Sequence, residues 1–272
     1  DAATILTTLR ALVAWDVWQS GRLEPALAPT IAMHCSDALL GGCRDIAAHH
    51  GLGLHMHVAE SALQVVSAQR LYGRGMLDHL DALGLLGPRF TAAHGVWLDA
   101  REYRLLADRG ASMVHLPLSN LRLGSGVADV PLARSAGLNV GLATDGANSA
   151  DRLDLLEVAK HATLVSRLLG GPPGDWVDAG AALTMATQGG AGCLGWGGTI
   201  GRLASGRQAD FTCVRLDDAG FVPMNQPLNQ LVTAVGGRAV ADVAVAGEFV
   251  LRDGRTTRVD AAAVRREAAG DA

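Results

Sequence analysis

The chain has 272 residues, of which 49% are hydrophobic and 18% charged, and its net charge is -4. No apolar run approaches the roughly 20 residues that a membrane-spanning helix needs. With 23 basic against 27 acidic residues, the chain has no cationic stripe that could follow a phosphate backbone. The composition therefore argues against both membrane and nucleic acid as partners.

The first residues, 1–15, read as an amphipathic helix without the cationic start and cleavage site of a signal peptide. The four cysteines show no CxxC spacing, which fits buried thiols in a reducing compartment. These features predict a cytoplasmic protein. Because the chain begins at Asp1, inside an apparent helix, we expect it to be N-terminally incomplete.

Short apolar segments then alternate with longer amphipathic ones, which is typical of repeated β-α units around a parallel sheet. We predict strands within residues 25–34, 52–60, 89–97, 111–118 and 138–146. We predict helices within residues 36–50, 73–86, 99–110 and 127–137.

The part after residue 150 has a different pattern. A helical region at 151–170 and a Gly-Pro linker at 170–175 precede another helix at 181–187. Residues 190–195 formally match GxGxxG, but they follow a helix and begin no β-α unit, so we interpret them as a loop rather than a dinucleotide site. The short alternating segments from 199 to about 260 predict antiparallel hairpins.

Polar residues gather at the predicted carboxyl ends of the parallel strands, where a β/α barrel builds its active site. They are His34, His57, Glu60, His94, His115 and Asp145. In the HxHxxE segment, His57 could bind a metal that activates water while Glu60 moves protons. A packed histidine pair with a surface glutamate explains this segment equally well. Asp145 adds a carboxylate suited to Zn²⁺ or Fe²⁺, although an aspartate before glycine is by itself typical of a turn.

Several segments together resemble the amidohydrolase superfamily, in its branch of aminohydrolases and chlorohydrolases acting on nitrogen heterocycles, such as 8-oxoguanine, isoxanthopterin and guanine deaminases. The resemblance covers nearly all of residues 25–262 and is carried, in order, by HMHVAES (55–61), TAAHG (91–95), HLPLSNLRLGSG (115–126), TDG (144–146) and TIGRLASGRQADF (199–211).

The resemblance implies a (β/α)8 (TIM) barrel of the metal-dependent hydrolase type, here lacking about its first three strands and their HxH ligand pair, with part of a small β-sandwich domain. On this basis we expect a partial barrel at 1–198, the small β domain at 199–262 and a polar tail at 263–272. His57 and Asp145 match metal ligands, and Glu60, His94 and Asp145 match catalytic positions. His34, Arg122 and Asn148 are candidate substrate contacts. His115 is expected to support the site by a hydrogen bond, and Ser119 and Asn120 to bond the backbone of a loop over it.

The expected cofactor is one divalent metal ion, Zn²⁺ ahead of Fe²⁺. The expected reaction is hydrolysis of a C–N bond, namely deamination of an amino-substituted purine, pterin or triazine by metal-bound hydroxide. The sequence leaves open whether the enzyme is a homo-oligomer. Two alternatives stay open. One is a chlorohydrolase or alkylaminohydrolase acting on a triazine-like ring. The other is a non-catalytic piece, because without the HxH pair this chain alone would be inactive.

Overall fold

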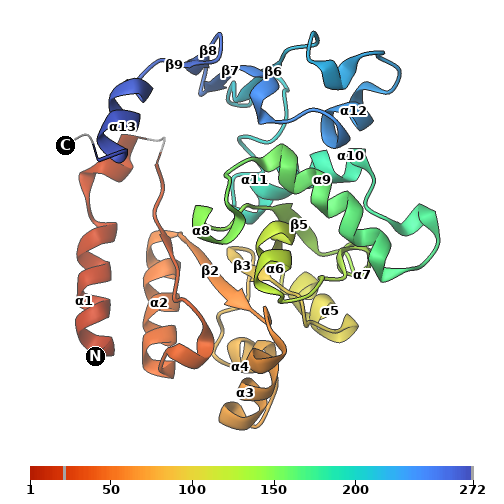
Figure 1. Cartoon of the computed structure of the whole chain (residues 1–272). Coiled ribbons are helices and arrows are strands. Elements are labelled where there is room, and N and C mark those ends of the chain that lie inside the picture. Colours follow the sequence, from red (N-terminus) through yellow and green to blue (C-terminus); the bar gives the residue numbers. More distant parts are fainter. Residues whose placement is uncertain (21–22, 271–272) are drawn as a thin grey trace.

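The computed structural model describes residues 1–20 and 23–270. Its larger part is built on a sheet of five parallel strands in the order β1-β2-β3-β4-β5, so each strand pairs with the next one in the chain (Figure 1). The strands are β1 (Ala26–Leu27), β2 (Gly53–Val58), β3 (Phe90–His94), β4 (Ser112–His115) and β5 (Asn139–Leu142). Sequential parallel strands joined through helices are the repeating unit of a β/α barrel. In the described part of the chain this sheet stays open between β1 and β5.

Most of the connecting helices begin at a residue whose side chain caps the helix. The connecting helices are α2 (Asp37–His50), α3 (Ala62–Tyr72), α4 (Met76–Ala82), α5 (Ala100–Asp108), α6 (Pro117–Leu123) and α7 (Val130–Ser135). Ser36 and Ser61 cap the amino ends of α2 and α3, and both helices end at a left-handed glycine. Asp99 and Glu102 form a capping box at α5. Local sequence therefore sets where these three helices begin.

Strand β2 shows how the sheet separates its core from its site. Leu54, Met56 and Val58 are buried, whereas His55 and His57 are only half-buried. Since successive side chains of a strand point to opposite faces, the histidines share the face away from those three apolar residues. The apolar residues belong to one core cluster that also contains Phe90, Tyr103 and Leu106.

Two segments flank the parallel sheet. The N-terminal helix α1 (Ala2–Val13) packs beside α2, as Figure 1 shows at the left. After β5 the chain forms α8 (Ala147–Ala150), α9 (Leu155–Ser166), α10 (Ala179–Thr184), a π-helical turn (Met185–Gly189) and α11 (Gly190–Cys193). The prediction of a loop at 190–195 is thus wrong for its first four residues, which continue a helix. Thr91 of β3 donates a hydrogen bond to the Cys193 carbonyl at 2.7 Å, and this contact ties α11 to the sheet.

The smaller part is an antiparallel sheet in the order β6-β7-β8-β9, in agreement with the hairpins expected after residue 199. Its strands are β6 (Phe211–Val214), β7 (Val240–Val245), β8 (Glu248–Arg252) and β9 (Arg255–Thr256). Helix α12 (Pro227–Thr233) lies between β6 and β7 in sequence and packs on α9 and α10 instead of on this sheet. Helix α13 (Ala261–Ala268) follows β9 and has no buried residue.

Two strand predictions need correction. The segment predicted at 25–34 contains only the two-residue β1, a single bridge between Ile31 and His57, and a 3-10 turn at Ala32–His34. Of the segment predicted at 111–118, the residues from Pro117 onward start helix α6. Proline suits the first helical position, because it has no N–H to leave unpaired and its φ is already helical. No helix within the described residues is long and apolar enough to cross a membrane.

Candidate active site

His57 is the second-last residue of β2, and a backbone carbonyl group holds its ring in place. Its ring nitrogen Nδ1 is 2.6 Å from the carbonyl oxygen of Thr30, and the backbone N–H of His57 donates to the same oxygen at 3.1 Å. Because a carbonyl can only accept, Nδ1 carries a proton, and in the neutral ring Nε2 keeps a lone pair. A metal-binding histidine is commonly oriented by such a bond from its other ring nitrogen.

Glu60 follows the end of β2 and is held from two sides. Gln64 accepts a hydrogen bond from the Glu60 backbone N–H at 2.8 Å and donates its amide to Glu60 Oε2 at 3.4 Å. Ser125 Oγ donates to Glu60 Oε1 at 3.4 Å. The carboxyl group, only 19% exposed, therefore has a defined position at the carboxyl end of the sheet.

His94 ends β3 and joins these two residues. Its ring stacks on that of His57, with centroids 5.4 Å apart and an interplanar angle of 20°. Its Nε2 lies 3.9 Å from Glu60 Oε2, while its Nδ1 lies 2.8 Å from Asn120 Oδ1. The structure thus brings His57, Glu60 and His94 together, as expected from their places at neighbouring strand ends.

Asp145 follows β5, three residues beyond its last residue. The Ser119 hydroxyl donates to Asp145 Oδ2 at 2.6 Å. We call His57, Glu60, His94 and Asp145 the cluster. Helix α6 contacts two of its members, since Asn120 bonds His94 and Ser119 bonds Asp145. The expectation that Ser119 and Asn120 bond loop backbone is wrong, because both side chains bind other side chains.

The backbone at these strand ends has an unusual conformation. Ala59, His94 and Asp145 have φ angles of 48°, 75° and 64°. Residues other than glycine seldom adopt this left-handed region, and such strain is concentrated at functional sites. Three of the five strands therefore end in a strained turn beside a candidate side chain.

The donor set has the right chemistry for a divalent metal but is small. His57 offers an imidazole nitrogen whose tautomer is already set, and Asp145 offers a carboxylate, which together suit zinc. Within residues 1–20 and 23–270, no group of three or more His, Cys, Asp and Glu side chains is placed to hold a metal ion. A catalytic zinc site takes three protein ligands, so these two residues fit as part of a ligand set and do not complete one.

The other three candidate residues form no hydrogen bond or ion pair with the described cluster residues. His34 is exposed, and its side chain bonds no described residue. Arg122 is exposed on α6 and forms an ion pair with Asp151. Asn148 is exposed on α8. A role for these three in substrate binding remains a prediction.

The parallel strands carry two further histidines, the half-buried His55 on β2 and the buried His115 at the end of β4. Burial lowers the pKa of His55. His115 is 1% exposed, and neither of its ring nitrogens has a hydrogen-bond partner among the described residues, so the supporting bond expected of it is not formed. Burial, and to a lesser degree the charge of His94, lowers the pKa of His115 to about 3. His115 is thus a neutral ring at physiological pH.

Sequence reasoning missed the residues that orient the cluster, namely Thr30, Gln64 and Ser125. Thr30 acts through its backbone, for which no side-chain signal exists. Gln64 lies one helical turn after Glu60, at the start of α3, and this spacing is the only signal that could have found it.

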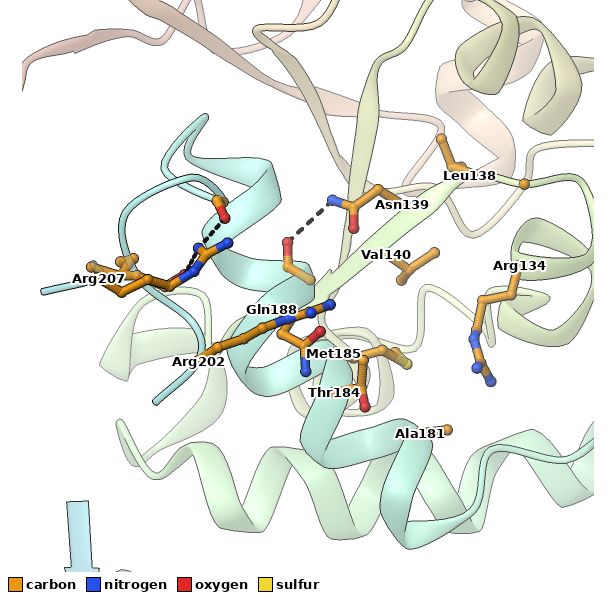
Figure 2. A pocket seen from close by; sticks show the side chains of 14 residues that line it. Arg134, Leu138, Asn139, Val140, Ala181, Thr184, Met185, Gln188, Arg202 and Arg207 are labelled. Carbon is orange, nitrogen blue, oxygen red and sulfur yellow. Dashed lines mark hydrogen bonds between the residues drawn. The ribbon is translucent and has the colours of Figure 1, made fainter. Parts of the chain in front are cut away.

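The larger cavities lie at the opposite end of the strands. Figure 2 shows one of about 530 Å³, into which Arg202, Gln188 and Thr184 project beside Asn139 at the start of β5, with Arg134 across from them. Another, of about 640 Å³, is lined by Leu52 and Arg89, which precede β2 and β3. Neither is lined by His57, Glu60, His94 or Asp145. These four side chains lie at the other end of the strands, the carboxyl ends.

Comparison with known proteins gives a consistent result. A model of the amidohydrolase family matches residues 2–250. The 5-methylthioadenosine/S-adenosylhomocysteine deaminase of Syntrophobacter fumaroxidans is 40% identical over 244 residues, which cover 86% of this chain and 54% of that protein. The 8-oxoguanine deaminase of Pseudomonas aeruginosa is 34% identical over 276 residues, covering 100% of this chain and 61% of that protein.

A solved structure agrees in fold. The crystal structure of an adenosine deaminase from Xanthomonas campestris with bound zinc has a TM-score of 0.92 and 34% identity, and the match covers 97% of this chain and 60% of that one. The chain therefore spans 54–61% of the length of these three proteins.

Proposed function

The chain belongs to the amidohydrolase family, and from this premise we propose that its strand ends form part of the active site of a metal-dependent aminohydrolase. The observation that carries the proposal is the cluster in which His94 stacks on His57 and lies 3.9 Å from Glu60. It combines a ligand nitrogen, a proton-transferring carboxyl group and a second imidazole at one edge of a barrel-type sheet.

His57 and Asp145 would hold the metal together with ligands outside the described cluster. Zinc is the proposed ion, because imidazole and carboxylate suit it and the Xanthomonas campestris structure contains it. A bound divalent metal supplies Lewis acidity, which makes water a usable nucleophile at neutral pH.

Glu60 would transfer the proton. Its carboxyl group is fixed by Gln64 and Ser125 at the edge of the cluster, so that it can take a proton from the attacking water and pass it to a ring nitrogen of the substrate. His94, almost fully buried, would orient the attacking water, from which its Nε2 can accept a hydrogen bond. The remaining hydroxyl proton, carried by Asp145, would then pass to the amine, which leaves as ammonia while the ring carbon becomes a carbonyl.

The proposed substrate class is a purine-like ring that carries an exocyclic amine. The relatives described above are named for deamination of adenosine-type compounds or of 8-oxoguanine, and these share such a ring. No feature of the cluster favours a chloride or alkylamine leaving group. A cytoplasmic location is proposed on sequence grounds alone.

The test is ammonia release from adenosine, 5-methylthioadenosine, guanine and 8-oxoguanine. It is run with zinc on the 272-residue chain and on the same chain with any in-frame residues that precede Asp1. We expect Glu60→Gln to lower turnover about 10²–10⁴-fold, the usual contribution of general acid-base catalysis, with unchanged zinc content.

The matched control is Glu157→Gln, which neutralises a partly buried carboxylate on α9 and should keep turnover. Equal activity of Glu60→Gln and the unmodified protein would remove Glu60 from the mechanism. Absence of ammonia from every substrate with both chains would contradict the proposed activity.

A further inference from the structure

The first turn of α6 carries two adjacent polar side chains that are completely buried. Ser119 and Asn120 are both 0% exposed, and each binds a different member of the cluster. Pro117 starts the helix at this point, directly after β4. The backbone that presents Asn120 to His94 is therefore anchored by a strand on one side and a helix on the other.

The contact to His94 sets the protonation pattern of its ring. Asn120 places its amide oxygen, Oδ1, 2.8 Å from His94 Nδ1. An amide oxygen only accepts, so Nδ1 carries a proton, and in the neutral ring Nε2 keeps its lone pair. This Nε2 is the atom that lies 3.9 Å from Glu60 Oε2. Because His94 is 1% exposed, bulk water does not compete for either nitrogen.

Asn120 is a poor choice for stability alone. Its amide nitrogen, Nδ2, is buried and has no hydrogen-bond partner among the described residues. A buried donor without a partner lowers stability, and leucine, of similar size, would avoid this loss. The geometry toward His94 supplies a reason for the amide that packing does not.

We propose that Asn120 is a positioning residue, which holds His94 in the tautomer protonated on Nδ1 and directs the unprotonated Nε2 toward Glu60. The tautomer is a property of the folded chain, and only its catalytic meaning rests on the function proposed above. Ser119, by its bond to Asp145, anchors the same turn on the other side of the cluster.

The experiment is ¹⁵N NMR of the histidine side chains in the full chain at pH 8, which reads the protonated and unprotonated ring nitrogens directly. The His94 signals are identified by their loss in His94→Gln. We compare the unmodified chain with Asn120→Leu, which removes the acceptor, and with Asn120→Asp, whose carboxylate restores one. Ser166→Ala is the matched control, since it deletes a buried side chain with its own hydrogen bonds on α9, outside the cluster.

We expect proton on Nδ1 and a bare Nε2 in the unmodified chain, in Asn120→Asp and in Ser166→Ala, and a shift of the proton toward Nε2 in Asn120→Leu. A proton on Nε2 in the unmodified chain would overturn the proposal even if Asn120→Leu does not fold. So would a folded Asn120→Leu with the original tautomer.

Turnover gives the second readout. With an active protein, Asn120→Leu should lower kcat at least tenfold with little change in KM, and Asn120→Asp should recover part of it. Unchanged kcat in Asn120→Leu would contradict the positioning role. If no variant releases ammonia, the proposed function fails, whereas the NMR result still decides the tautomer.

Discussion

Acid should destabilise this protein through His115, whose ring is buried without a hydrogen-bond partner in the described structure. Its pKa is lowered from 6.5 to about 3, chiefly by burial. Below pH 6.5 the unfolded chain therefore binds a proton that the folded chain does not. The stability contributed by neutral His115 is fully present above pH 6.5 and is lost as the pH falls toward 3.

The size of the effect follows from the same two values. A single uncompensated proton gives a slope of about 1.4 kcal/mol per pH unit. Over the whole interval the loss is of order 5 kcal/mol as an upper limit. This is comparable with the total stability of many domains, so the effect is measurable well before pH 3.

The assay is urea unfolding followed by tryptophan fluorescence between pH 8 and pH 4.5, for the unmodified chain and for His115→Leu. At pH 8 the variant should be as stable or more stable, because an apolar side chain replaces unpaired polar atoms. On acidification its stability should fall less steeply, by about 1.4 kcal/mol per pH unit. His55, whose pKa is also lowered by burial, acts in the same direction in both chains and cancels in the comparison.

The control is His49→Gln, which removes an exposed histidine and should keep the steep acid slope. If His115→Leu loses stability with acid as steeply as the unmodified chain, His115 takes up its proton in the folded state and the reasoning is wrong.

Three further predictions concern single contacts. Arg109 lowers the pKa of Asp81 through a side-chain hydrogen bond, so the pair stabilises the fold above the unfolded pKa of aspartate and loses this contribution as the pH falls below it. Asp81→Asn should therefore cost no more than about 1 kcal/mol at pH 7, as exposed pairs do, and less at pH 2.5; an equal cost at both pH values in urea titrations would disprove the pairing. Gly189→Ala should destabilise the fold by more than about 2 kcal/mol, because a Cβ there would lie 2.2 Å from the Val140 carbonyl oxygen. The control Gly198→Ala, with open space around it, should change stability by no more than about 0.5 kcal/mol. Similar melting temperatures for the two variants would refute this packing. Tyr103→Phe should cost about 1–2 kcal/mol, since the buried hydroxyl donates to the Gly95 carbonyl at 3.0 Å, and an unchanged urea midpoint would show that the bond contributes nothing.

The periodic pattern of the sequence was enough to predict most of the parallel-strand unit. Strands β2 to β5 lie within their predicted segments, because each is a short apolar run between capped helices. The segment at 25–34 was overestimated, since its Pro25 and Pro29 interrupt the backbone donors that a longer strand would need. At 190–193 glycines suggested a loop, but close packing of Gly189 and Gly190 against β5 keeps the chain helical there.

The candidate site was predictable where strand ends carry the side chains, and not where tertiary contacts orient them. His57, Glu60 and His94 meet because adjacent parallel strands end at the same edge. The roles of Asn120 and Thr30 depend on which atoms of a following helix and a preceding loop come within 3 Å of a ring nitrogen. No spacing in the sequence specifies such a distance.

The most direct test of the account is the zinc content of the protein, measured by inductively coupled plasma mass spectrometry after dialysis against zinc. It compares the unmodified protein with His57→Ala and with the control His161→Ala, since His161 also binds a backbone carbonyl through Nδ1 but lies on α9. Both the 272-residue chain and the same chain with any in-frame residues before Asp1 are measured. The account predicts bound zinc that is lost in His57→Ala and kept in His161→Ala. Zinc retained in His57→Ala, or absent from every form, would contradict it.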